Sequence, residues 1–350
     1  MKFIHCSDIH LDSKMERNLT AAQARERNTE VCATFARMAS FAAGEGVTAV
    51  LLAGDLFDTQ RATAQTVGFV LDTVRNTPNV DFLYLRGNHD VSAFDGWDTP
   101  ENFKTFSDGW TYYRYGDAVI AGMELEPAYG DLDLPEDTVN IVTLHGQTAT
   151  QPGEELIALP LLKRKNIDYL ALGHIHSYQI GKLDDRGSWC YCGCLEGRGF
   201  DELGPKGFVL VTVENRMLCH EFIPFARRTL EEVRVDITDL VTVSQILAAA
   251  ETACTGIPAE NLVKLTLTGS YTLETQKDLQ FLKKMLEGRF WFLKVKDESS
   301  LKIEKESYEH DLSLKGEFIR LVMASGRTEE EKERMILWGI RALSGEEVAL

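Results

Sequence analysis

Metal-binding residue types recur in five short segments of this sequence, and each segment follows an apolar run. The segments are Asp8-Ile9-His10, Gly54-Asp55-Leu56-Phe57-Asp58, Gly87-Asn88-His89-Asp90, His145-Gly146 and Gly173-His174-Ile175-His176. They hold five of the 8 histidines in the 350 residues. Carboxylate, amide and imidazole groups at the ends of strands are the donors with which proteins hold divalent ions. The pattern therefore predicts a two-metal site.

The chemistry expected of such a site is the hydrolysis of phosphate esters. These esters resist hydrolysis because their anionic oxygens repel a nucleophile, and two divalent ions about 3.5 to 4 Å apart neutralise the phosphate and supply hydroxide at neutral pH. Seven side chains are the predicted ligands, with Asp55 as the expected bridge: Asp8, His10, Asp55, Asn88, His145, His174 and His176. This mixture of nitrogen and oxygen donors suits Mn²⁺, Fe or Zn better than Mg²⁺. We expect two divalent ions, with Mn²⁺ first among them.

Each residue taken alone has a simpler interpretation. A lone Asp after a strand is usually a turn residue or a helix cap, and a lone His is usually a core residue with its hydrogen bonds satisfied. All five segments in this order, each at the end of an apolar run, argue against that interpretation.

The apolar pattern predicts the elements that must position these segments. Strands are expected over 2–7, 48–53 and 80–85, with helices over 20–43 and 60–75 between them, and short strands dominate from about residue 111 to 222. We therefore expect two packed sheets with helices on their outer faces. Downstream, strands and helices alternate, including a helix over 275–286 that opens with Thr275-x-x-Asp278, and helices over 314–324 and 328–343 form a hairpin.

These patterns predict three parts: a phosphoesterase domain at 1–228, a smaller α+β domain at 229–310 and a helical hairpin at 311–350. The net charge of −17 argues against the general attraction to phosphate backbones that nucleic-acid binders usually show. The sequence has no apolar run of 18 residues and no leader-like start, and its 7 cysteines suggest no disulfide framework. We expect a soluble cytoplasmic protein without a membrane partner.

The five segments together resemble the calcineurin-like metallophosphoesterases, whose pattern D-x-H, G-D-x-x-[DH], G-N-H-[DE], H and G-H-x-H is complete between Asp8 and His176. The resemblance implies an α+β fold, a four-layer α/β/β/α sandwich with a smaller capping domain. It further implies that His89 protonates the leaving oxygen and that Asp58 orients His89. It implies two ligand sets that share Asp55: Asp8, His10, Asp55 and His176 for one ion, and Asp55, Asn88, His145 and His174 for the other.

Within that superfamily the chain is similar to the SbcD/YhaO-like DNA repair nucleases, on residues 3–12, 54–58, 169–176, 195–202 and 206–208. The resemblance implies a DNA exonuclease or endonuclease whose C-terminal domain caps the active site. It also implies an SMC-like ATPase partner that docks on the C-terminal helices, within 317–343, and it allows a homodimer.

Two other functions share part of this pattern. A phosphatase or phosphodiesterase for small molecules or phosphoproteins would keep every metal ligand, and the acidic charge favours it. A non-catalytic scaffold that binds an ATPase would not need the complete ligand set together with His89 and Asp58.

Overall fold

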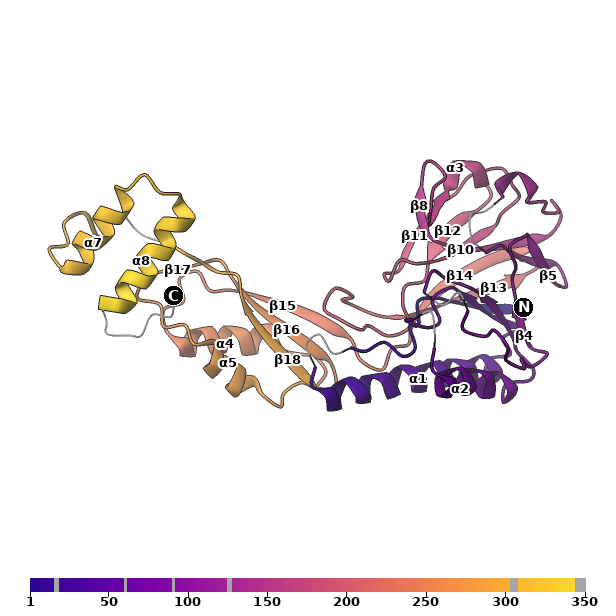
Figure 1. Cartoon of the computed structure of the whole chain (residues 1–350), viewed down its shortest axis with the longest axis horizontal. Coiled ribbons are helices and arrows are strands. Elements are labelled where there is room, and N and C mark those ends of the chain that lie inside the picture. Colours follow the sequence, from indigo (N-terminus) through magenta and orange to yellow (C-terminus); the bar gives the residue numbers. More distant parts are fainter. Residues whose placement is uncertain (16–18, 60–61, 90–91, 125–127, 303–307, 344–350) are drawn as a thin grey trace. The chain divides into compact units, whose positions relative to one another are not determined.

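The computed structural model describes the chain except for residues 16–18, 60–61, 90–91, 125–127, 303–307 and 344–350. The chain divides into two compact units, Met1–Leu230 and Glu231–Leu350 (Figure 1). The predicted boundary at residue 228 lies two residues from this division. The three-part division with its functional labels stays a prediction.

Two six-stranded sheets form the centre of the first unit. In spatial order, the first sheet contains β14 (Met217–Pro224), β13 (Gly207–Glu214), β1 (Lys2–Cys6), β2 (Ala49–Ala53), β3 (Asp81–Leu85) and β4 (Phe103–Thr105). The second contains β11 (Gln179–Lys182), β12 (Ser188–Tyr191), β10 (Tyr169–Gly173), β7 (Val139–His145), β6 (Ala118–Gly122) and β5 (Thr111–Tyr115). The pairs β1–β2, β2–β3 and β7–β10 are parallel.

The central strands are apolar on both faces because both faces are covered. One face of the first sheet packs on α1 (Ala21–Gly44) and α2 (Ala64–Arg75), where Phe35 and Val70 join the core of Val50 (Figure 1). The other face packs on the second sheet, with Leu51 and Ile141 in the shared core. Parallel strands that are buried on both faces read as continuous apolar runs, and this explains why the sequence predicted them.

The outer face of the second sheet is covered by short elements rather than by long helices. These are the 3₁₀ turn η1 (Tyr129–Asp131), the paired strands β8 (Gln147–Ala149) and β9 (Leu156–Ala158), and the one-turn helix α3 (Leu159–Leu162). Their apolar side chains, such as Ile157 and Leu162, form a third core with Leu170 of the sheet. The predicted α/β sandwich of two sheets is confirmed, and its fourth layer is thin.

The second unit contains a small sheet, β15 (Leu230–Asp236), β16 (Leu262–Thr268) and β18 (Phe292–Asp297), which shares a core with α4 (Val243–Ala253) and α5 (Leu279–Leu286). Helix α5 begins four residues later than the predicted Thr275, because the Asp278 side chain accepts a hydrogen bond from the Phe281 N–H and caps it there. A separate core unites the short pair β17 (Ser270–Tyr271) and β19 (Ser300–Leu301) with α7 (Leu314–Met323) and α8 (Glu329–Leu343). Within the described residues, no helix combines the length and apolarity needed to cross a membrane.

A buried ion-pair network joins α1 to the segment that follows β12. The Arg27 side chain is 1 % exposed and contacts the carboxylates of Glu30 and Glu196, the latter at 3.1 Å. It also donates to the Gly197 carbonyl at 2.8 Å. Arg228 lies on the same Glu30 carboxylate at 2.6 Å, so charges from three separate segments meet at one point.

We expect the Arg27→Met substitution to lower the free energy of unfolding by about 3 kcal/mol or more, because it leaves the buried Glu196 carboxylate without its cation. Urea unfolding followed by circular dichroism measures this loss. The matched control is Arg25→Met on the exposed face of the same helix, which should change stability by less than about 0.5 kcal/mol. Equal effects of the two substitutions would contradict the proposed role of the network.

Candidate metal centre

Parallel strands bring the predicted ligands to one edge of the sandwich. Asp8 follows β1, Asp55 follows β2 and Asn88 follows β3, and these three strands are neighbours. His145 is the last residue of β7, and His174 directly follows β10. Because the carboxyl ends of parallel strands meet at the same edge, residues as far apart in sequence as Asp8 and His174, 166 positions, become neighbours.

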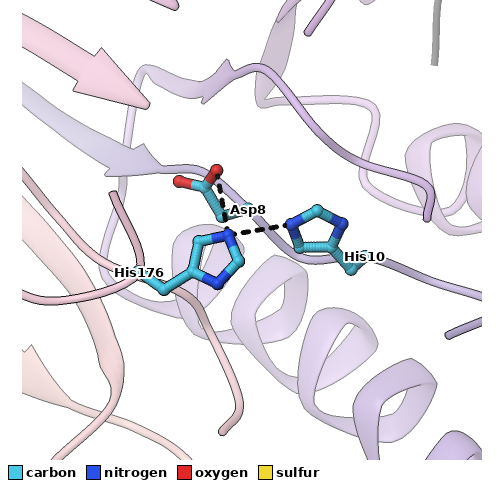
Figure 2. A group of neighbouring side chains, drawn as sticks. All are labelled: Asp8, His10 and His176. Atoms are coloured by element: carbon cyan, nitrogen blue, oxygen red, sulfur yellow. Dashed lines mark hydrogen bonds and ion pairs between the residues drawn. The ribbon is translucent and has the colours of Figure 1, made fainter. Parts of the chain in front are cut away.

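Asp8, His10 and His176 form the first group of converging donors (Figure 2). The Nε2 atoms of His10 and His176 face each other at 3.1 Å, and His176 Nε2 lies 3.8 Å from Asp8 Oδ1. Asp8 is fully buried and His10 is 2 % exposed. Two imidazole nitrogens and a buried carboxylate that point at one place are a fitting donor set for a divalent ion.

Asp55 stands between this group and the other predicted ligands. Its Oδ2 atom lies 3.9 Å from His10 Nε2 and 3.3 Å from His145 Nε2. His145 Nε2 in turn lies 3.1 Å from Asn88 Oδ1, and the His145 and His174 rings are neighbours at 5.4 Å between centroids. A carboxylate that reaches histidines of both predicted ligand sets has the position of a bridge.

The outward-facing nitrogen of three predicted ligands lies against an acceptor. His145 Nδ1 lies 2.9 Å from the Ala53 carbonyl, His176 Nδ1 lies 2.6 Å from Glu202 Oε1, and His10 Nδ1 lies 3.1 Å from Asp58 Oδ1. The contacts of His145 and His176 are hydrogen bonds, whereas that of His10 has the distance of an ion pair without hydrogen-bond alignment. An acceptor on one ring nitrogen keeps the proton there and leaves the lone pair of Nε2 free toward the site. Metal-ligating histidines are usually held in this way.

The backbone around the site is strained. Asp8, His10, Asp55 and His174 have positive φ angles of 51°, 49°, 51° and 102°. For residues other than glycine this conformation costs on the order of 1 to 3 kcal/mol, and it persists where the surrounding structure enforces it. Four of the seven predicted ligands share this conformation. The backbone strain therefore lowers local stability at the positions where the side chains must point into the site.

Two motif glycines leave room for the ligands. A Cβ atom on Gly87 would lie 2.1 Å from Asp55 Oδ1, and one on Gly54 would lie 2.1 Å from His145 Nδ1. Gly54 also has a φ of +91°, which favours glycine. The glycines of the Gly-Asp and Gly-Asn-His segments are therefore required by close packing against predicted ligands.

The electrostatics of the site follow from burial and from the two acidic ligands. Burial, the largest single effect, opposes the charged form of both Asp55 and His145. It is outweighed by their mutual hydrogen bond together with the nearby charges and backbone hydrogen bonds, so the pKa of Asp55 falls well below its usual range. The pKa of His145 rises to about 9, with the charge of Asp8 contributing. Burial lowers the pKa of His10 and of His174. The neutral form is therefore favoured at His10 and His174, and the charged form at His145.

The donors fit divalent metal ions, and they form two overlapping groups. Besides the first group, Asp8, Asp55 and His145 also lie close enough to hold an ion. Buried carboxylates are costly unless they are paired or bind a metal, and Asp8 and Asp55 lie side by side with exposed fractions of 0 % and 2 %. The ligands named from the sequence are thus brought together, while the assignment of each to one ion stays a prediction.

The predicted catalytic pair is arranged differently from the prediction. His89 is exposed, and its Nδ1 lies 3.3 Å from the main-chain carbonyl of Asp58 rather than from the carboxylate. The Asp58 carboxylate instead contacts His10 and, at 2.8 Å, Arg198 Nη1. Asp58 can therefore still hold His89, through its backbone, while its side chain supports a predicted metal ligand.

Two further residues complete the site and were not among the predicted site residues. Glu202 is 7 % exposed and holds His176, and Arg198 Nη2 lies 3.0 Å from Glu202 Oε1. Arg198 thereby bridges the partners of His10 and His176. Both residues lie in the stretch 195–202, which carries part of the resemblance to the repair nucleases. That resemblance was the feature of the sequence that could have indicated them as site residues.

Comparison with known proteins agrees with this geometry. Residues 1–178, just over half of the chain, match the family described as "Calcineurin-like phosphoesterase". The chain belongs to the calcineurin-like phosphoesterases. As a member of this family it is a metal-dependent hydrolase, and the match ends two residues beyond His176.

Relatives of this phosphoesterase share a large part of its length. The uncharacterized metallophosphoesterase YhaO of Bacillus subtilis is 27% identical over 341 residues, covering 85% of this chain and 82% of that protein. The DNA double-strand break repair protein Mre11 of Saccharolobus solfataricus is 22% identical over 386 residues, covering 99% and 96%. Mre11 of Haloferax volcanii is 27% identical over 247 residues, covering 66% and 52%. The predicted calcineurin-like family is confirmed, and these relatives agree with the predicted SbcD/YhaO-like branch.

We expect metal binding to release a proton from His145. In the metal-free protein His145 is protonated up to a pKa of about 9, whereas a ligand must be neutral, so affinity should rise about tenfold per pH unit between pH 6.5 and 8.5. Calorimetric titration with Mn²⁺ in buffers of different ionisation enthalpy measures both the affinity and the released proton. A His145→Asn variant should bind more weakly and lose this slope. Equal affinity of the unmodified protein at both ends of the pH range would refute the expectation.

Proposed function

We propose that this phosphoesterase is a two-metal DNA phosphodiesterase that acts in DNA repair. The observation that supports it best is the similarity to Saccharolobus solfataricus Mre11, a DNA double-strand break repair protein, across 99% of this chain. That similarity includes the second unit, which a resemblance of the metal motifs alone would not require. The donor set at the strand ends supplies the hydrolytic chemistry.

The residues of the chain have distinct tasks in this proposal. Asp8, His10, Asp55 and His176 would hold one ion, and Asp55, Asn88, His145 and His174 the other; when bound, such ions neutralise the phosphate and activate water. His89 lies beside His10, at 5.3 Å between ring centroids. Its Nδ1 faces the Asp58 carbonyl and can donate to it, so the imidazolium form of His89 would carry its second proton on Nε2 and give it to the leaving oxygen, returning to the neutral ring.

One observation favours a second candidate, a phosphodiesterase for small substrates. The chain has a net charge of −17, and a duplex is attracted by clustered Lys and Arg that neutralise its phosphates. This candidate uses the same metal ligands and the same acid, so only the substrate distinguishes the two.

Cleavage assays with the Mn²⁺-loaded protein test the proposal on labelled DNA hairpins, on blunt and recessed DNA ends, and on bis-p-nitrophenyl phosphate. We expect hydrolysis of DNA as well as of the small ester. The His89→Asn variant should lose about 100-fold or more on DNA, because the sugar alkoxide needs a proton to leave. It should lose less on the small ester, since nitrophenolate leaves unprotonated, and it should retain Mn²⁺ affinity. Activity on the small ester with none on any DNA would favour the second candidate.

We further propose that an SMC-like ATPase subunit binds the C-terminal helical segment. Leu312, Leu314 and Leu321 are 97 %, 71 % and 64 % exposed there, and apolar side chains this exposed are typical of protein contacts when they cluster. The other face of the same segment is held in place by the buried Ile319, Val322 and Ile336.

A homodimer also stays a prediction, and light scattering on the purified protein measures the oligomeric state.

Co-purification with a tagged SMC-like ATPase from the same organism tests this partner. We expect the Leu314→Asp/Leu321→Asp variant to lose binding by tenfold or more, on the order of what two buried apolar anchors contribute. The matched control is Leu161→Asp, which changes a 44 % exposed leucine of the first unit. Retained binding of the double variant would exclude this docking surface.

A further inference from the structure

The two expected ions are supported in different ways. We call the ion expected at the first group of donors the first ion, and the one expected beside His145 the second ion. For the second ion, His145 Nδ1 lies 2.9 Å from the main-chain carbonyl of Ala53, the last residue of β2. For the first ion, His10 and His176 have carboxylate side chains behind them. Main-chain support is part of the sheet, whereas side-chain support depends on what keeps those carboxylates in place.

One arginine keeps both carboxylates in place. Arg198 Nη1 lies 2.8 Å from Asp58 Oδ1, the oxygen that faces His10 Nδ1 at 3.1 Å. Arg198 Nη2 lies 3.0 Å from Glu202 Oε1, and the same oxygen lies 2.6 Å from His176 Nδ1. The guanidinium therefore spans the two carboxylates with the donors of one rigid planar fork. We call Asp58, Arg198 and Glu202 the clasp.

The clasp is itself anchored to the site. The Arg198 backbone N–H donates to Glu202 Oε2 at 2.7 Å, so both oxygens of that carboxylate are engaged. Lys206 is 4 % exposed, and its Nζ donates to the His176 carbonyl at 2.8 Å. The stretch 198–206 thus holds His176 by its ring and by its backbone. Only 18 % of the Arg198 side chain is exposed, so water screens its ion pairs less than it screens surface pairs.

Removal of the guanidinium would loosen one side of the centre. The Asp58 and Glu202 carboxylates would remain behind His10 and His176 without the cation that joins them, and a shielded carboxylate without a partner is costly. The Nε2 atoms of these two histidines lie 3.1 Å apart (Figure 2), so small rotations of either ring would change the donor set. The carbonyl support of His145 would stay as it is.

We propose that the clasp positions the ligands of the first ion alone, so that Arg198 decides whether the centre holds one ion or two. The inference rests on the proposed two-metal function and specifies how its centre is assembled. The second ion is bound by ligands that the sheet orients, and the first ion is bound when the stretch 198–206 is locked onto His10 and His176. Arg198 acts through Asp58 and Glu202 and is therefore a positioning residue.

Calorimetric titration of the full chain with Mn²⁺ tests the clasp, together with electron paramagnetic resonance. The unmodified protein should bind two ions and show the spectrum of an exchange-coupled pair. The Arg198→Gln variant should bind one ion about 10- to 100-fold more weakly, as expected when the outer partners of ligating histidines are lost. The other affinity should change by about twofold or less. With only the tighter site filled, the spectrum should be that of isolated Mn²⁺.

Two further backgrounds identify the weakened ion. In the Asn88→Ala protein, which lacks a predicted ligand of the second ion, Arg198→Gln should weaken the remaining binding by the same factor of about 10 to 100. In the His10→Asn protein, which lacks a ligand of the first ion, it should change the remaining binding by about twofold or less. Arg198→Lys should restore affinity only in part, because an ammonium group keeps the charge but not the fork.

The matched control is Arg186→Gln. Arg186 Nη2 lies 2.9 Å from Asp168 and donates to the Thr138 carbonyl at 2.7 Å, just before β10 and β7 and thus at the opposite end of these strands from the ligands. This variant should keep both affinities. Equal weakening of both ions in Arg198→Gln, unchanged affinity for both, or the same loss in Arg186→Gln would each overturn the clasp and leave the proposed function standing. Absence of Mn²⁺ binding and of phosphodiester hydrolysis in the unmodified protein would instead refute the proposed function.

Discussion

Two buried carboxylates, Asp8 and Asp55, impose the constraint on which the rest of the site depends. They lie at the ends of neighbouring parallel strands with almost no exposure to water. Negative charge in such a place must be compensated, because desolvation of an unpaired carboxylate is costly. His10, His145 and His176 converge on these two groups, and the hydrogen bond of His145 to Asp55, together with the charges of both carboxylates, raises the pKa of His145.

The supports of the site extend well beyond the donor atoms. His176 is held by Glu202, and Glu202 is held by Arg198, which also contacts Asp58 behind His10. A few residues earlier in the same stretch, Glu196 is fixed to α1 through Arg27. The long helix on the outer face of the first sheet is thus tied by ion pairs to the same short stretch of chain whose Arg198 and Glu202 support the metal centre. Positive φ angles at four predicted ligands are sustained by this rigid surrounding.

Most of the fold and the donor set could be predicted from the sequence because their signals are local. Central strands such as β2 are apolar throughout, and the ligand segments follow them directly. The partner of a side chain is not a local property. Asp58 was expected to orient His89 with its carboxylate, but that carboxylate lies on His10 and Arg198, the second of which is 140 residues away. The outer layer over the second sheet was predicted as helical, but its make-up from short strands and single turns was not, because short irregular elements have no periodicity.

The sequence by itself determined the chemistry, since the type, order and spacing of Asp, Asn, His and Gly at strand ends are sufficient to indicate a calcineurin-like phosphoesterase. Only the tertiary structure decided how those groups are held and what surrounds them. Glu202 behind His176, and Arg198 between Asp58 and Glu202, arise where segments distant in sequence meet. The physical reason is that donor identity is encoded residue by residue, whereas orientation, burial and local charge are properties of the packed chain.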